Sequence, residues 1–150
     1  MDKHTICLLN DSFPPIIDGV ANAVVNYAEN IEKHHGHAVV VTPAVPGADD
    51  SGFPFPVVRY PSIDTRRLVG YVAGYPFSPE TALRVREEKV ELLHTHCPIA
   101  SAILARSLRE VADAPLVLTY HTKYDIDIAK AVKSRLLQES AIRALVQNVN

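Results

Sequence analysis

The sequence contains little cysteine and no tryptophan, and it has neither a long apolar run nor an excess of basic residues. Its two cysteines, Cys7 and Cys97, lie in or beside apolar segments, where thiols usually pack in the core, so we expect no disulfide. The 15 lysines and arginines against 17 aspartates and glutamates argue against nucleic acid as a partner. No signal peptide pattern is visible, and no apolar run approaches the roughly 20 residues of a membrane-spanning helix. We therefore expect a cytoplasmic protein.

The length of 150 residues and the apolar fraction of 47% suit one globular domain. Short β-branched runs alternate with longer segments of helical period, which is typical of a Rossmann-like, doubly wound and mostly parallel α/β sheet with helices on both faces. Gly36 is predicted to end the first helix, and residues 61–77 are predicted to be an irregular surface loop. We expect strands at residues 5–9, 38–42, 56–60, 90–95 and 116–120, and helices at 19–33, 78–88, 98–111 and 126–149.

The stretch NDSFPPIIDGVANAV, residues 10–24, leads from the first predicted strand into the first predicted helix. Asp18 can cap this helix, whose first N–H groups have no partner within it and, together with the helix dipole, favour an anion. Gly19 has no Cβ, so a phosphate or a sugar can approach its backbone closely. The alternative interpretation is a plain turn and cap, and the dinucleotide fingerprint G-x-G-x-x-G is absent.

Two histidines alternate in LLHTHCP, residues 92–98, at the end of the fourth predicted strand. His94 and His96 share one side of an extended chain, because every second side chain points the same way. One interpretation is a packed or hydrogen-bonded pair beside a polar ligand. The other is a metal-dependent phosphoesterase, whose further metal ligands would come from His121, Asp11, Asp125 and Asp127.

The third stretch, LTYHTKYDID, residues 118–127, follows the fifth predicted strand. It places His121, Thr122 and Lys123 at the edge of the sheet where ligands bind, although the same residues also suit an ordinary surface loop. A histidine can hydrogen-bond a sugar or a phosphate there, and a lysine can neutralise a phosphate. No pattern of a side-chain nucleophile such as G-x-S-x-G appears, which disfavours hydrolase chemistry of that kind.

These three stretches resemble, in type, order and spacing, the N-terminal domain of the retaining two-domain glycosyltransferases of the GT-B fold, family 4. The Asp-Gly-Val after the prolines looks most like the branch that glycosylates diacylglycerol or other lipid and small polyol acceptors. The resemblance implies that the chain is the acceptor-side half of the fold. It also implies that the nucleotide-sugar-binding C-terminal domain is absent from residues 1–150, so we expect the isolated chain to be inactive and to bind no cofactor.

By this resemblance, His121 would hydrogen-bond the transferred sugar or polarise the reacting centre. Gly19 would place its backbone against a donor phosphate or the acceptor, and His96 would line the same cleft. Asp18 replaces a glycine found in many members, and we expect its carboxylate to cap the helix rather than face a diphosphate. Thr122 and Lys123 would support an acceptor or a phosphate.

Arg66 and Arg67 lie beside apolar and aromatic residues in DTRRLVGYVAGYPF, residues 64–77. A basic pair of this kind suits an anionic membrane surface or an acceptor phosphate, and the alternative is a solvated loop. The expected partners are therefore the absent donor domain, a glycolipid acceptor or membrane surface, and a second copy of the chain through the helix at 126–149. A non-catalytic Rossmann-like binding or assembly module remains the second alternative to a transferase.

Overall fold

Strands and helices alternate along the chain in a computed structural model that describes residues 3–65, 67, 72–121 and 143. The helix expected at 126–149, and with it the proposed self-association, falls outside these residues except for position 143. The described elements, in chain order, are β1 (His4–Leu9), α1 (Gly19–His34), β2 (Gly36–Pro43), β3 (Val57–Tyr60), β4 (Ser62–Ile63), β5 (Ala73–Gly74), α3 (Pro79–Glu87), β6 (Leu92–Thr95), α4 (Ala100–Ala112) and β7 (Leu116–Leu118).

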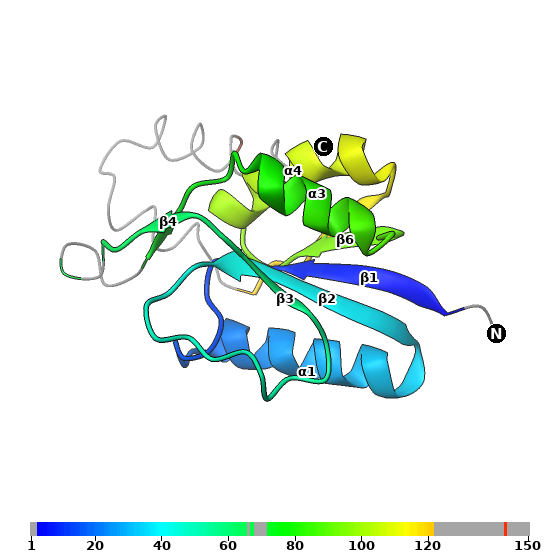
Figure 1. Ribbon diagram of the computed structural model, residues 1–150, viewed down its shortest axis with the longest axis horizontal. Coiled ribbons are helices and arrows are strands. Elements are labelled where there is room, and N and C mark those ends of the chain that lie inside the picture. Colours follow the sequence, from blue (N-terminus) through cyan, green and yellow to red (C-terminus); the bar gives the residue numbers. More distant parts are fainter. Residues whose placement is uncertain (1–2, 66, 68–71, 122–142, 144–150) are drawn as a thin grey trace.

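The main sheet is parallel, and among the described residues its strands follow the order β3-β2-β1-β6-β7. Helix α1 covers one face, and α3 and α4 cover the other (Figure 1). The predicted Rossmann-like α/β class, with helices on both faces, is therefore confirmed. Because all these strands are parallel, their carboxyl ends meet at one edge, where the loops after β1, β6 and β7 come together.

The core has two layers because successive side chains of a strand point to opposite faces. In β1, Cys7 and Leu9 pack into the layer under α3 and α4, whereas Leu8 packs into the layer under α1. All three side chains are fully buried, and burial raises the pKa of the Cys7 thiol. Cys7 is therefore a core residue, as its apolar setting predicts.

Helix α1 begins as predicted, because the Asp18 carboxylate accepts a hydrogen bond from the Ala21 N–H at 2.7 Å. The role predicted for Gly36 is wrong: His35 is the C-cap of α1, and Gly36 is the first residue of β2. A Cβ at Gly36 would collide with the backbone carbonyl of His4 on the adjacent strand β1. The glycine is thus needed for close strand approach and not for ending the helix.

The other elements differ from the prediction mainly at their ends. Ser78 caps α3 through its side chain, as its place before Pro79 predicts, whereas α4 begins at Ala100, later than Pro98 indicates. Residues 61–77 are not wholly irregular, because β4 and β5 form an antiparallel pair there. Gly74 of this pair lies so close to the Tyr60 ring that a Cβ would overlap it.

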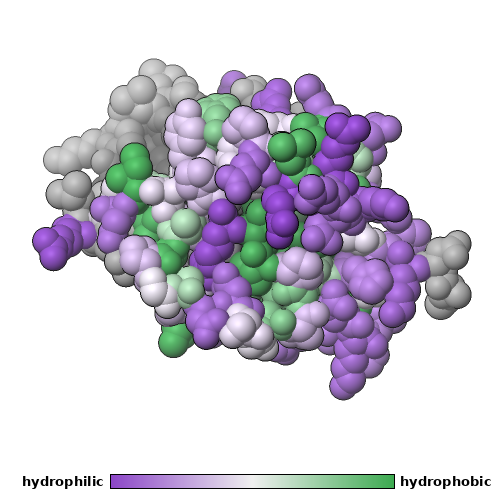
Figure 2. All heavy atoms as spheres, viewed as in Figure 1, coloured by the Kyte–Doolittle hydropathy of each residue, from purple (hydrophilic) through white to green (hydrophobic). Residues whose placement is uncertain are grey.

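The face of the molecule seen in Figure 2 is mostly hydrophilic, with apolar residues gathered in small groups among the charged ones. This is the surface expected of amphipathic helices that turn their apolar stripes toward a sheet. Within the described part of the chain, no helix combines the length and the apolar character needed to span a bilayer.

Candidate functional site

A pocket of about 590 Å³ opens at the carboxyl end of the sheet. Three segments far apart in the sequence form it: the β1–α1 loop with the start of α1, the residues after β6, and the residues after β7. Its lining consists of Asn10, Asp11, Ser12, Asp18, Gly19, Val20, His96, Cys97 and His121. The pocket therefore lies where parallel α/β sheets bind their ligands.

The α1 side of the pocket consists of the first turn of the helix. Asp18 uses its carboxylate on the Ala21 N–H, so its negative charge is held at the positive end of the helix dipole. Gly19 is exposed, and a Cβ placed on it would meet no atom within 4 Å. An anionic or polar group can thus approach the backbone of Gly19 from the pocket.

Three histidines, His94, His96 and His121, form a row, and two of them, His96 and His121, line the pocket. The rings of His94 and His96 lie with centroids 4.1 Å apart, as expected for alternate residues of one strand. His96 Nδ1 and His121 Nε2 are 2.8 Å apart and share a hydrogen bond, in which one imidazole donates and the other accepts. His94 Nε2 pairs with Thr119 Oγ1 at 2.7 Å. His121, which is exposed at the end of the row, is held by His96.

His96 is the buried centre of this row. It is 1% exposed, and no described residue offers a hydrogen-bond partner to its Nε2 atom. Burial, together with the nearby His94 and His121, lowers the pKa of His96 to about 3. Burial and His121 also lower the pKa of His94. His94 and His96 are therefore neutral near pH 7.

This burial predicts a loss of stability in weak acid. In the unfolded chain His96 takes up a proton as the pH falls through 6.5, whereas in the folded protein its pKa is about 3. Stability is therefore complete above pH 6.5 and is lost as the pH falls from 6.5 toward 3. Between pH 7 and pH 5 we expect the free energy of unfolding to fall by about 2 kcal/mol from His96, with His94 adding in the same direction. Denaturant unfolding at each pH measures this.

The matched variants for this measurement are His96→Asn and His37→Gln. His96→Asn keeps a polar atom near the position of Nδ1 but cannot titrate, so we expect a clearly shallower dependence of stability on pH. His37 is exposed at the opposite end of the sheet, and its replacement controls for the loss of an imidazole. An unchanged slope in His96→Asn would show that the acid sensitivity has another origin.

Asp11 connects the pocket to helix α4. Its carboxylate accepts hydrogen bonds from the backbone N–H groups of Ser101 at 2.6 Å and Ala100 at 3.2 Å, so it caps α4 from across the sheet. The Cys97 thiol at 3.0 Å and the Tyr60 hydroxyl at 3.3 Å also donate to it. Burial, and then the Asp11 charge, raises the pKa of Tyr60, so this hydroxyl stays protonated and donates.

The structure brings together four of the eight site residues predicted from the sequence. Asp18, Gly19, His96 and His121 line the pocket, whereas Arg67 is exposed in the segment after β4 and is not among the lining residues. The other three predicted site residues, Arg66, Thr122 and Lys123, lie outside the described residues. The sequence predicts Asp11 only as a possible metal ligand. It does not predict that Asn10, Ser12, Val20 and Cys97 line the pocket.

The metal centre that the alternative phosphoesterase interpretation requires is not formed by the described residues. In residues 3–65, 67, 72–121 and 143, no three histidine, cysteine or acidic side chains are placed to hold a metal ion. His96 bonds His121, and the Asp11 carboxylate is used at the start of α4. Asp125 and Asp127 lie outside the described residues. The described residues therefore give the phosphoesterase interpretation no support.

Comparison with known proteins agrees with this arrangement. The family model of Glycosyltransferase Family 4 matches residues 17–148. The chain is similar to an alpha-monoglucosyldiacylglycerol synthase of Acholeplasma laidlawii, at 29% identity over 79% of this chain and 30% of the relative. It is also similar to a protein of the same name from Streptococcus pneumoniae, at 22% identity over 95% of this chain and 32% of the relative.

A third relative is a GDP-mannose-dependent alpha-mannosyltransferase of Corynebacterium glutamicum, at 25% identity over 78% of this chain and 29% of the relative. The chain thus spans about a third of the length of these curated relatives. The family match, by contrast, extends over most of the chain and includes Asp18, Gly19, His96 and His121. The chain belongs to glycosyltransferase family 4.

Proposed function

We propose that this chain is the acceptor-side domain of a retaining glycosyltransferase that transfers a sugar from a nucleotide-sugar donor to a lipid or small-molecule acceptor. One observation carries the proposal: the pocket places the N-terminus of α1 opposite His96 and His121 in a chain of glycosyltransferase family 4. The donor nucleotide would be held mainly by a second domain that closes over this pocket. The chain itself would bind no cofactor.

The start of α1 suits the leaving group of such a reaction. As the anomeric C–O bond breaks, the sugar becomes oxocarbenium-like and negative charge builds on the leaving diphosphate. Helix N–H groups aimed at that charge stabilise it without having to reorganise. Gly19 would supply this contact through its accessible backbone, while the Asp18 carboxylate stays hydrogen-bonded to Ala21.

We expect the histidine row to bind the transferred sugar through His121. His121 is exposed in the pocket, where it can donate a hydrogen bond to a hydroxyl of the transferred sugar or polarise the reacting centre. His96, buried and neutral, would hold the His121 ring in one orientation through their 2.8 Å hydrogen bond. Thr122 and Lys123 would contribute to the acceptor or phosphate contacts beside it.

A lipid acceptor is supported by the names of two relatives, both alpha-monoglucosyldiacylglycerol synthases. The third relative is named for GDP-mannose and for an alpha-mannosyltransferase activity, which supports a nucleotide-sugar donor. Arg66 and Arg67 would contact an acceptor phosphate or an anionic membrane surface. In the sequence they lie between Ile63, which is 67% exposed, and Tyr75, which is 53% exposed. A peripheral location on the cytoplasmic side of a membrane follows from this proposal.

The test compares the complete gene product with the 150-residue chain. We expect the complete product to transfer radiolabelled sugar from UDP-glucose or GDP-mannose to diacylglycerol in vesicles or to a soluble polyol, with the α configuration kept. We expect the isolated chain to transfer none, because the donor-binding half is missing. Absence of transfer from either donor to every acceptor, with folded complete protein, would contradict the proposed function. Turnover by the isolated chain would contradict the need for a second domain.

A further inference from the structure

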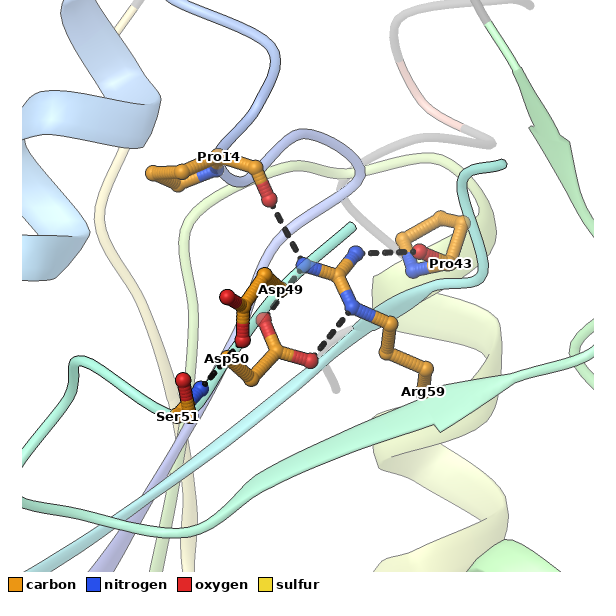
Figure 3. Close-up of polar contacts among 6 residues, drawn as sticks. All are labelled: Pro14, Pro43, Asp49, Asp50, Ser51 and Arg59. Atoms are coloured by element: carbon orange, nitrogen blue, oxygen red, sulfur yellow. Dashed lines mark hydrogen bonds and ion pairs between the residues drawn. The ribbon is translucent and has the colours of Figure 1, made fainter. Parts of the chain in front are cut away.

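Arg59 on β3 joins two loops and the end of β2 at the carboxyl end of the sheet (Figure 3). Its Nε and Nη2 atoms each donate to the Asp50 carboxylate at 2.7 Å, which forms a bidentate ion pair. Nη2 also donates to the backbone carbonyl of Pro14 at 2.6 Å, and Nη1 donates to that of Pro43 at 3.1 Å. One guanidinium thus ties together the β1–α1 loop, the end of β2 and the β2–β3 loop.

The bond to Pro14 connects this cluster to the pocket. Pro14 lies in the loop that runs from β1 to Asp18 and Gly19 at the start of α1. The preceding residue, Phe13, is fully buried and packs against the Phe53 ring with centroids 5.0 Å apart. The loop therefore has two adjacent anchors, one apolar and one polar, between the pocket residues at 10–12 and those at 18–20.

We propose that Arg59 is a positioning residue of the transferase, which holds the β1–α1 loop so that the backbone of Gly19 is correctly placed in the pocket. Arg59 does not line the pocket, so it acts through the Pro14 carbonyl rather than on the substrate. Asp50 fixes the orientation of the guanidinium. The catalytic part of this inference rests on the proposed function, whereas the structural part does not.

The geometry requires arginine rather than any cation. The Arg59 side chain is 13% exposed, so its acceptors have little water to replace a lost donor. A guanidinium offers five N–H groups in a rigid fork and reaches the carboxylate and both carbonyls at once. A lysine ammonium is a single point on a flexible stem and cannot serve all three. Arg59→Lys therefore keeps the charge and removes the clamp.

The experiment measures Arg59→Lys in the complete gene product by kinetics and by hydrogen exchange. We expect kcat/KM for the nucleotide sugar to fall about tenfold, because a small displacement of a group that contacts the transition state costs rate, while KM for the acceptor stays unchanged. We also expect faster amide exchange in residues 10–21 and unchanged exchange in the second half of α1. Asp50→Asn, which keeps the bond from Arg59 to Pro14, should show the same changes more weakly.

The control is Arg84→Lys, since Arg84 is an exposed arginine of α3 whose ion pair with Glu87 spans 3.9 Å. It should alter neither readout. Exchange that is unchanged at residues 10–21, or that rises equally throughout α1 and β2, would overturn the proposal. A rise in KM for the acceptor as large as the fall in kcat/KM for the nucleotide sugar would also overturn the proposal. If the wild-type protein transfers no sugar, the proposed function fails, and the exchange at residues 10–21 still decides whether Arg59 holds the loop.

Discussion

Replacing His121 by alanine in the complete protein should lower kcat roughly 100- to 1000-fold, the usual effect of removing one hydrogen-bond donor aimed at a transition state. His121 is the exposed end of the histidine row, and among the described residues only its Nε2 atom is engaged, with His96 Nδ1 at 2.8 Å. The remaining ring nitrogen is therefore left for a substrate in the pocket. Steady-state kinetics with saturating acceptor and varied nucleotide sugar measures the effect.

The matched control is His37→Ala, which removes an exposed imidazole at the opposite end of the sheet and should leave kcat unchanged. His121→Ala also leaves the buried His96 Nδ1 atom without its partner, which should lower the free energy of unfolding by about 1–3 kcal/mol. Circular dichroism at the assay temperature therefore has to show that the variant is folded before its lower rate is assigned to the reaction. A His121→Ala variant with the wild-type kcat would show that His121 has no part in the reaction, even if the protein is a transferase.

Hydrophobic periodicity predicts the sheet and its covering helices because each apolar run here has a face to pack against. In β1, alternate side chains serve two core layers, and in α1 the buried positions recur at helical spacing. Local rules also predict the Asp18 and Ser78 caps, because each cap bonds a residue three positions away. The same rules fail at Gly36, whose requirement comes from the neighbouring strand and not from its own helix.

The site is only partly predictable for the same reason. Gly19, His96 and His121 follow strands that share a carboxyl edge, so the sequence indicates that they are neighbours. No local pattern shows that Asp11 bonds Ser101, which is 90 positions away, or that Arg59 bonds Pro14, which is 45 positions away. These contacts depend on strand order and on the start of α4, neither of which has a signature near Asp11 or Arg59. Long-range polar contacts are thus what the sequence leaves undetermined.

Asp11 illustrates what such a contact does. Helix α4 begins with Ile99 as its N-cap residue, and Ile99 has no side chain that can bond the first N–H groups. The Asp11 carboxylate supplies that cap from the loop after β1, and it also receives the Tyr60 hydroxyl. The Asp11 carboxylate accepts hydrogen bonds from the first N–H groups of α4 and also forms part of the pocket wall. Asp11 therefore bonds two N–H groups at the start of α4, whereas Asp18 bonds one, that of Ala21, at the start of α1 and leaves the backbone of Gly19 exposed.

We expect Asp11→Ala to lower the free energy of unfolding by about 3 kcal/mol, the sum of a lost helix cap and a buried Tyr60 hydroxyl left without its acceptor. For a domain of this size, that loss corresponds to a fall in Tm of roughly 10 °C. Thermal unfolding followed by circular dichroism measures it. Asp11→Asn keeps one oxygen for Ser101 and Tyr60 but turns an amide NH₂ toward Ala100 and Cys97, so its Tm should lie between those of the wild type and Asp11→Ala.

Asp49→Ala is the matched control, because Asp49 is exposed and, among the contacts described, its carboxylate bonds only the nearby Ser51. Its Tm should stay near that of the wild type. Tyr60→Phe separates the two parts of the Asp11 effect, since it removes the hydroxyl and keeps the ring that packs against Gly74. If Asp11→Ala melts at the wild-type temperature, α4 does not depend on Asp11, and the α4 N-terminus is open to a ligand as well. If Asp11→Ala is destabilised and Tyr60→Phe is much less so, the helix cap is the larger part of the contribution of Asp11 to stability.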